Sequence, residues 1–459
     1  MTVQDQLRLL PGVDALLRTT SIQALIEAHG HDLVVEAVRA TLDQVRAAIL
    51  SGAPCPGESE IVDQSAQLLT NLTQPSLHPV INATGVIIHT NLGRAPLCDA
   101  ALEAMVAVGR GYSNLEYDLD AGRRGSRYTH ANALLCRLTG AEAALVVNNN
   151  AGAVLLALTA LAQDREVVIS RGQLVEIGGG FRIPDVMRQS GARLVEVGAT
   201  NRTHLRDYEQ AIGPDTRMLM VAHQSNFRMT GFATQVPARD LVTLGHARGL
   251  LVYEDLGSGT LLDTQPYGFS PEPTVQSAIA AGIDLVSFSG DKLLGAPQAG
   301  ILIGREDLIA QLRRHPLTRA LRVDKTTLAG LQATLLHYVR GDAEQMVPVW
   351  RMISMPTASI RRRALRWAGK MRQAGLKVEV IEGRSAAGGG SLPGETVPSQ
   401  VLSLATDAPD RVAAALRAHD PPVIVRIEND LICLDPRTVL PEQDKDLLRA
   451  MLDVFEAQD

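Results

Sequence analysis

Aromatic residues and cysteines are scarce in this chain of 459 residues. Phe, Trp and Tyr together make up 3% of the sequence, so the chain lacks the exposed rings on which single-stranded nucleic acid stacks. The four cysteines form neither a CxxC pair nor a zinc-ligand spacing, which favours reduced thiols and predicts no metal site. They are Cys55, Cys98, Cys136 and Cys433.

A secretory signal and a membrane span are also missing from the sequence. The N-terminus has no basic segment followed by an apolar one, and no apolar run approaches 18 residues. The formal net charge is -6, from 44 basic and 50 acidic residues, so no overall cationic field indicates nucleic-acid binding. We therefore expect a cytoplasmic protein that does not bind membranes.

Lysine is the third residue type in short supply, because the chain has five lysines among its 44 basic residues. Arginine therefore supplies most of the positive charge. Lysine differs from arginine in that its amine can form a Schiff base with a carbonyl. Lys292, in the middle of the chain, is either an ordinary surface lysine or a residue kept for that chemistry. Its neighbours in the sequence favour the chemistry.

Hydrophobic periodicity divides the chain into three regions. Residues 1–75 carry apolar residues three and four apart, which predicts a small helical domain with Ser21 capping its second helix and a linker at 51–60. Residues 76–312 form the expected large domain, and residues 313–459 a smaller α/β domain. Its strands are expected at 376–383, 399–406 and 423–435, with helices at 411–419 and 444–457.

The large domain has short apolar runs that alternate with helical stretches. Several of the runs lack polar alternation, as strands do when helices cover both faces of a sheet. They lie at 143–148, 166–170, 193–197, 217–222, 250–255, 284–288 and 299–304, with helices expected at 151–162 and 237–249. This pattern predicts an α/β fold with a mostly parallel sheet, whose ligands gather at the carboxyl ends of the strands.

The segment DLVSFSGDKLLGAPQAGILIG (284–304) places Lys292 at such a strand end. A buried strand leads to Ser289 and a glycine-rich turn before the next strand. A lysine there, with Ser289 available to a phosphate group, suits a Schiff base with a cofactor aldehyde. The turn by itself is common and would be weak support.

Asp255 in VYEDLGSGT (252–260) follows a second apolar strand directly. A carboxylate at that place can pair with a protonated pyridine nitrogen. A turn or helix-capping Asp is the commoner role for a single residue. Lys292 follows 37 residues after Asp255, and this ordered pair is more specific than either part.

Two further strand ends carry polar residues. In VVNNNAGAVLLAL (146–158), Asn150, Ala151 and Gly152 open a helix whose N–H groups could bind a phosphate, although an ordinary capped turn would look the same. In VAHQSNFRMTGF (221–232), His223 could lie near a cofactor ring and Asn226 could hydrogen-bond its oxygen. Either could instead be a satisfied polar residue at a sheet edge.

These elements in this order are typical of fold-type-I pyridoxal-phosphate (PLP) enzymes, and longer blocks make the similarity closer. The chain resembles bacterial selenocysteine synthase, the L-seryl-tRNA(Sec) selenium transferase family. The resemblance covers nearly the whole length, including LPGVDALL near the N-terminus and GGGSLPGETVPSQVLSL near the end. The central blocks are HPVINATGVIIHTNLGRAPL (78–97), NLEYDLDAGRRGSRYTH (114–130), RGQLVEIGGGFRIPDVM (171–187), HQSNFRMTGF (223–232), YEDLGSG (253–259) and SGDKLLGAPQAGI (289–301).

The resemblance implies an aminotransferase-like large domain and a PLP-dependent reaction. The serine on seryl-tRNA(Sec) would become selenocysteine, with selenophosphate as the selenium donor. Lys292 would hold PLP and remove the α-proton, and Asp255 would support the ring as an electron sink. The serine hydroxyl would leave as water before selenium adds.

The resemblance also assigns residues to selenophosphate, a multiply charged anion that needs cations. Arg94, Arg319 and Arg322 match active-site arginines of the family, and a spacing of three predicts that the last two share a helical face. His89 and Asp291 fall in matching motifs and are expected to shape the same pocket. For any one of these arginines, a surface salt bridge is the ordinary alternative.

The implied partners are tRNA and further copies of the chain. In the family the N-terminal domain holds the tRNA and the enzyme is a homodecamer built from dimers, so we expect at least a dimer. Residues 1–60, however, contain four Arg against eight Asp or Glu. The most basic stretch is 359–377, which we interpret as the solvated face of an amphipathic helix rather than an RNA contact.

Two alternative functions remain open from the sequence. A PLP lyase acting on a free amino acid or amino sugar would also use Lys292 and Asp255, but it would have no evident use for residues 1–75. A protein that binds PLP or RNA without turnover would need neither the Asp–Lys pair nor the arginines. The N-terminal region therefore favours the transferase over the lyase, and the Asp–Lys pair with the arginines favours it over a protein without turnover.

Overall fold

The computed structural model describes residues 2–178 and 180–456, and it forms two compact units, Met1–Pro79 and Val80–Asp459. The first unit is helical within the described residues. Its helices are α1 (Val3–Arg8), α2 (Val13–Leu17), α3 (Thr20–His29), α4 (His31–Leu50) and α5 (Glu58–Thr73). The apolar periodicity of α4 is confirmed, because its buried residues recur every three or four positions from Val34 to Ile49.

Two details of this unit differ from the sequence-based prediction. Thr19, not Ser21, caps α3, because its hydroxyl accepts a hydrogen bond from the backbone N–H of Ile22 at 3.4 Å. The predicted linker at 51–60 is shorter, since α5 already begins at Glu58. That helix was not predicted because its first turn is polar and follows directly on a segment rich in Gly and Pro.

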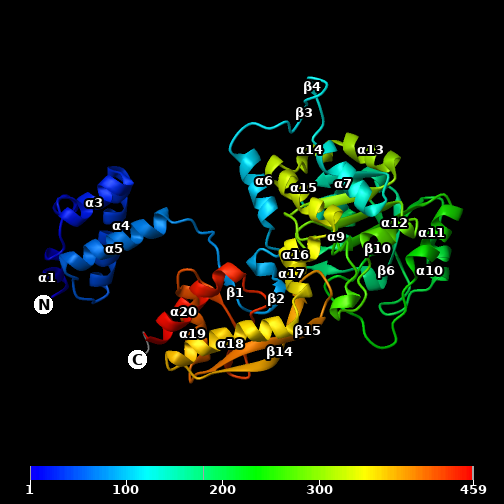
Figure 1. The fold of residues 1–459 in the computed structure, drawn as a ribbon. Helices are drawn as coiled ribbons and strands as arrows, with labels where there is room; N and C mark the ends of the chain where they lie inside the picture. Colours follow the sequence, from blue (N-terminus) through cyan, green and yellow to red (C-terminus); the bar gives the residue numbers. More distant parts are fainter. Residues whose placement is uncertain (1, 179, 457–459) are drawn as a thin grey trace. The chain divides into compact units, whose positions relative to one another are not determined.

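The second unit is built around a seven-stranded sheet in which every predicted run of the large domain is a strand (Figure 1). The order is β5-β13-β12-β11-β10-β6-β9. Strands β6, β9, β10, β11 and β12 are parallel, whereas β13 is antiparallel to both neighbours. Their bounds are β5 (Ala143–Val147), β6 (Glu166–Ser170), β9 (Arg193–Val197), β10 (Thr216–Ala222), β11 (Leu251–Gly257), β12 (Leu285–Ser289) and β13 (Gly300–Gly304).

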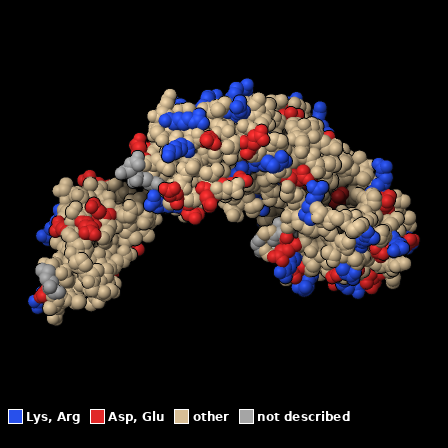
Figure 2. Space-filling model, turned by 90° about the horizontal axis from the view of Figure 1, so that it is seen from below, with Lys and Arg blue, Asp and Glu red and all other residues tan. Residues whose placement is uncertain are grey.

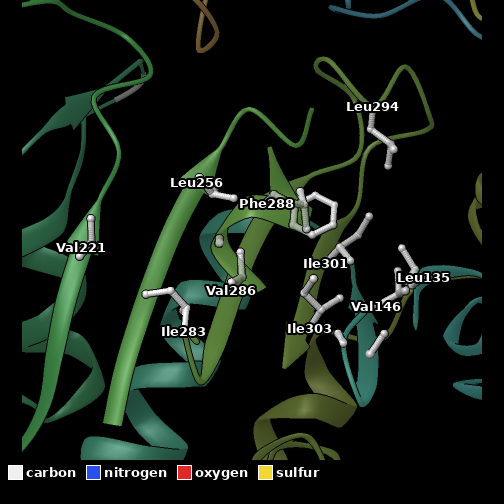
Figure 3. Packing of buried hydrophobic residues seen from close by; sticks show 14 of the residues in the cluster. Leu135, Val146, Val221, Leu256, Ile283, Val286, Phe288, Leu294, Ile301 and Ile303 are labelled. Carbon is white, nitrogen blue, oxygen red and sulfur yellow. The ribbon is translucent and has the colours of Figure 1, made fainter. Parts of the chain in front are cut away.

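Helices cover both faces of this sheet, which explains the unbroken apolar strands. One face packs against α8 (Asn150–Ala162), α9 (Ile183–Ser190) and α13 (Glu306–Arg314). The other packs against α7 (Thr129–Thr139), α10 (Leu205–Ala211), α11 (Ala238–Ala247), α12 (Val275–Ala280) and α15 (Lys325–Arg340). In Figure 3 the side chains of Val286, Phe288, Ile301 and Ile303, from β12 and β13, lie together in this second layer.

A five-stranded sheet lies at the C-terminal end, in the order β17-β18-β15-β14-β2. Its strands are β2 (Val86–Ile88), β14 (Val378–Gly388), β15 (Thr396–Ala405), β17 (Arg426–Glu428) and β18 (Leu431–Leu434). The predicted run 423–435 is divided into β16 (Val423–Ile424), β17 and β18. The turn between β17 and β18 uses Asn429 and Asp430, both at positive φ. Helices α18 (Thr357–Gln373), α19 (Pro409–Ala418) and α20 (Asp444–Glu456) pack on these strands, and position 457 of the predicted last helix lies outside the described residues.

Residues 81–88 hydrogen-bond to the C-terminal region, although the sequence placed them in the large domain. Strand β1 (Ile81–Asn82) pairs with β16, and β2 pairs with β14. The boundaries of the three predicted domains stay a prediction. The pairing means that the segment which leads to His89 and Arg94 is held by the small sheet.

The remaining elements of the second unit are short or peripheral. They are η1 (Thr90–Leu92), α6 (Asp99–Gly109), β3 (Tyr117–Asp118), β4 (Arg123–Arg124), η2 (Arg171–Gln173), β7 (Glu176–Ile177), β8 (Phe181–Arg182), η3 (Gln265–Tyr267), α14 (Pro316–Ala320), α16 (Ala343–Met346), α17 (Pro348–Ser354) and η4 (Pro441–Gln443). Among the described residues, no helix has the length and apolarity that crossing a bilayer requires.

The core beside the strand end can be tested with Phe288→Ala. Phe288 is fully buried on β12, so we expect truncation to lower the free energy of unfolding by about 3–5 kcal/mol. Chemical denaturation followed by circular dichroism measures the change. Leu365→Ala on α18 is the control, because this side chain is 41% exposed and should cost no more than about 0.5 kcal/mol. Equal effects of the two substitutions would contradict the packing described.

Candidate functional site

Lys292 lies in a tight turn directly after β12 and is only 6% exposed. The turn is fixed by backbone hydrogen bonds, including Leu293 N–H to Ser258 O at 3.1 Å and Gly290 N–H to Ala299 O at 2.9 Å. Gly295 has a φ of +69°, and a Cβ there would lie 2.3 Å from Val347. Gly295, which the sequence predicted to keep this turn tight, is therefore required by close packing as well as by conformation.

The amine of Lys292 is enclosed by backbone from two directions. A Cβ placed on Gly390 would lie 2.6 Å from the lysine Nζ, and one on Gly257 would lie 3.7 Å from it. Burial lowers the pKa of Lys292 below its ordinary value, and the charge of Arg94 adds to this effect, although Asp255 opposes it. An amine with a lowered pKa is a better nucleophile toward a carbonyl at neutral pH.

Asp255 lies on β11, next to the strand that leads to Lys292, and its carboxylate is buried. Its Oδ1 accepts hydrogen bonds from Asn150 Nδ2 at 2.8 Å and from Ser287 Oγ at 3.1 Å. Burial raises the pKa of Asp255, while the hydrogen bond from Asn150 and the charge of Lys292 act in the opposite direction. The carboxylate is therefore held in one orientation beside the lysine.

At the start of α8 (149–152), the polar side chains have different partners from those the sequence predicted. Asn149 caps α8, because its Oδ1 accepts from Gly152 N–H at 2.8 Å. Asn150 orients Asp255, a role that sequence reasoning missed, while Ala151 is exposed. Gly152 is buried, and a Cβ there would lie 2.9 Å from Leu321. Phosphate binding by Asn150, Ala151 and Gly152 stays a prediction.

The end of β10 brings His223 and Asn226 to the same edge of the sheet. His223 N–H donates to Asp255 O at 2.9 Å, and its Nε2 lies 3.3 Å from Glu272 Oε1. Asn226 Nδ2 donates to Glu176 O at 2.7 Å. Glu272 was not predicted, because it lies in a loop without a recognisable motif.

His89, Arg94 and Asp291 are brought together, as the resemblance implied. Arg94 Nη1 donates to Asp291 Oδ2 at 2.7 Å, and Arg94 N–H donates to His89 O at 3.0 Å. Burial lowers the pKa of His89. Arg94 has a φ of +65°, a conformation that non-glycine residues rarely adopt, which places its guanidinium next to the turn that carries Asp291 and Lys292.

Arg319 and Arg322 do not share a helical face, so that prediction was wrong. Helix α14 ends at Ala320, and the chain then extends along the end of β5, where Asn148 N–H donates to Leu321 O at 3.0 Å. Arg322 Nη2 lies 2.5 Å from Glu116 Oε1 in an ion pair, whereas Arg319 is exposed. The pairing with the strand end, and not a helix, therefore determines where Arg322 lies.

Three buried polar atoms around the lysine and the aspartate have no hydrogen-bond partner among the described residues: Asn150 Oδ1, Asn226 Oδ1 and Ser258 Oγ. Buried polar groups are nearly always satisfied in folded proteins. Ser289, the last residue of β12, is also buried, three positions before Lys292. The Ser258 hydroxyl can donate to a phosphate oxygen, and the two amide oxygens can accept from an N–H or O–H of a ligand. The site therefore fits a polar ligand such as PLP.

Comparisons with known proteins agree along the whole chain. A family model described as L-seryl-tRNA selenium transferase matches residues 80–440, and a second, selenocysteine synthase N terminal, matches residues 7–46. The L-seryl-tRNA(Sec) selenium transferase of Carboxydothermus hydrogenoformans is 46% identical over 449 residues, which cover 96% of each chain. The protein of the same name from Desulfomicrobium baculatum is 51% identical over 415 residues, which cover 89% of each.

A similar structure is that of D-glucosaminate-6-phosphate ammonia-lyase. It aligns with a TM-score of 0.58 at 22% identity, covering 83% of this chain and 96% of that one. At this identity the likeness concerns the fold. The chain has the α/β architecture of the fold-type-I PLP enzymes.

The glycine contact over Lys292 can be tested with Gly390→Ala. The added methyl group would collide with the lysine side chain. Such overpacking costs about 1–3 kcal/mol. Because the displaced lysine is the residue that binds PLP, we expect a roughly tenfold to hundredfold weaker affinity for PLP. The absorbance change on titrating the protein with PLP measures this affinity. Gly394→Ala is a matched control, because Gly394 has a similar φ of +71° but no atom within 4 Å of the added Cβ. If both variants lost affinity for PLP to the same extent, strain in the backbone rather than the contact with Lys292 would explain the loss. No loss in Gly390→Ala would contradict the contact.

Proposed function

The chain belongs to the L-seryl-tRNA selenium transferase family, and we propose that it converts L-seryl-tRNA(Sec) to L-selenocysteinyl-tRNA(Sec) with PLP as cofactor and selenophosphate as selenium donor. The observation that carries the proposal is the buried pair of Lys292 and Asp255 at adjacent strand ends, in a chain whose relatives match both its N-terminal and its central regions.

PLP fits the site by the chemistry of the surrounding groups. Lys292 would bind its aldehyde, and Asp255 would face its pyridine nitrogen. Ser289, His223, Asn226 and the start of α8 would contact the rest of the molecule. When bound, PLP supplies an electron sink for the carbanion that forms at the α-carbon of the seryl group.

The side chain of Lys292 serves as the base. Burial lowers its pKa and so raises the unprotonated share of the amine, which is the form that can accept the α-proton of the seryl group. Gly390 leaves room for the amine but for no additional side chain beside it. The ion pair of Arg94 with Asp291 holds a cation next to this base.

Arg94 is the first candidate for binding the oxygens of selenophosphate, since arginine binds such anions through two parallel hydrogen bonds. Arg322 and Arg319 are assigned to the same anion by the family motif. Arg322 is paired with Glu116, which also binds Arg127 at 2.7 Å, so anion binding by Arg322 would require it to exchange this carboxylate for the substrate.

Seryl-tRNA is the proposed aminoacyl substrate, and we expect the reaction to occur in the cytoplasm. The distribution of charged side chains does not indicate which surface would bind RNA, because Figure 2 shows basic and acidic side chains mixed on the face it presents. We propose that the N-terminal unit binds the tRNA and that the enzyme acts as a homo-oligomer built from dimers.

A PLP lyase for a small amino compound is the second candidate, since the ammonia-lyase shares the fold. The matched N-terminal region 7–46 favours the transferase.

The proposed reaction can be tested by following labelled selenium from selenophosphate into aminoacyl-tRNA. We expect label on seryl-tRNA(Sec) and none on seryl-tRNA(Ser). Lys292→Ala should abolish the transfer, because it removes both the cofactor anchor and the base. Lys445→Ala, at an exposed position on α20, should retain full activity.

Loss of transfer in Lys292→Ala but not in Lys445→Ala would support substrate, cofactor and base together. PLP bound through Lys292 without transfer to tRNA would overturn the proposed substrate and leave the small-molecule lyase as the better assignment. Equal labelling of both tRNAs would contradict the proposed specificity.

A further inference from the structure

A buried carboxylate that the motifs do not include lies against the site. Glu272 belongs to the loop between η3 and α12, and its side chain is 4% exposed. Its Oε1 lies 3.3 Å from His223 Nε2 and has no hydrogen-bond partner in the part of the chain that the structure describes. A buried carboxylate is strongly destabilising unless a cation compensates it, and His223 is the nearest group that can do so.

The loop is built to hold Glu272 in place. Thr264 is fully buried, and its Oγ1 accepts from Glu272 N–H at 3.1 Å while donating to Ser270 O at 2.7 Å. Ser270 Oγ donates to Glu395 Oε1 at 2.8 Å, which connects the loop to the glycine-rich segment over Lys292. These contacts hold the backbone of the loop on both sides of Glu272, and its carboxylate lies against His223.

Several charged groups face the imidazole. Glu272 contacts it directly, and Glu254 and Asp255 lie on the neighbouring strand β11. The charge of Glu272 also acts on Lys292, whose pKa it raises. Burial lowers the pKa of His223, but the contact with Glu272 and the charges of Glu254 and Asp255 outweigh it, so the net pKa is raised. Burial raises the pKa of Glu254 to about 7, so this second carboxyl is only partly ionised at neutral pH. Glu272 is therefore the main compensating charge.

We propose that Glu272 is a positioning residue that orients the His223 imidazole and keeps it protonated at the edge of the site defined by Lys292 and Asp255. His223 then presents a fixed cationic donor to an oxygen of the bound cofactor or substrate. The inference deepens the proposed function, since it concerns the same site. Its test uses the protein without added cofactor or tRNA, so its failure and the failure of the transferase assignment are distinguishable.

The test is the pH dependence of His223 acylation by diethylpyrocarbonate, which reacts with neutral imidazole, with peptide mass spectrometry as the readout. Glu272→Gln keeps the size of the side chain and removes its charge. We expect the pH of half-maximal His223 reactivity to fall by about one unit in this variant, equivalent to a tenfold change in the proton affinity. His246 on α11, which pairs at 3.2 Å with Asp284 just before β12, is the internal standard and should not change.

Two further variants separate charge from packing. Glu272→Asp retains a carboxylate and should restore most of the wild-type pH dependence. Glu254→Gln should shift the profile less than Glu272→Gln. The proposal is overturned if Glu272→Gln leaves the profile unchanged, or if Glu254→Gln gives the larger shift.

The unmodified protein provides a test that does not depend on the folding of any variant. Its His223 should reach half-maximal reactivity above the ordinary histidine pKa of about 6.5. A value at or below this figure would also overturn the proposal, because it would show an imidazole that gains no proton affinity from Glu272.

Discussion

The close approach of glycine backbone to the amine of Lys292 is the constraint on which the site depends. Gly390 comes from the C-terminal segment after β14, and Gly257 ends β11, so two distant parts of the chain enclose one side chain. This enclosure removes water from the amine and lowers its pKa. The enclosure joins the two sheets, because Gly390 follows β14 of the small sheet whereas Lys292 follows β12 of the large one.

Several ionisable groups lie close together around the lysine. Asp255 and Glu272 are buried carboxyl groups near Lys292 and His223, while Arg94 is paired with Asp291 at the border. Unpaired charges in such a place would be costly, so each group restricts the protonation of its neighbours. A site organised in this way can hold a base, a carboxylate for a pyridine ring and cationic donors within one small volume.

Much of this site could be predicted because its residues follow apolar strands. Asp255, His223 and Lys292 each come directly after a buried run, and parallel strands bring their carboxyl ends to one edge. The shared face of Arg319 and Arg322 could not be predicted in the same way. A spacing of three indicates a helix, but pairing with the end of β5 overrides the helical propensity after Ala320.

The sequence by itself determined the order of strands and helices, the lysine and its aspartate, and the family to which the chain belongs. These features are local in the chain, since they rest on periodicity and on motifs of contiguous residues. Only the tertiary structure decided that Asn150 orients Asp255, that Gly390 closes over Lys292 and that Glu272 meets His223. Those contacts join residues from 49 to 105 positions apart, and such pairings depend on how the layers pack rather than on any pattern along the chain.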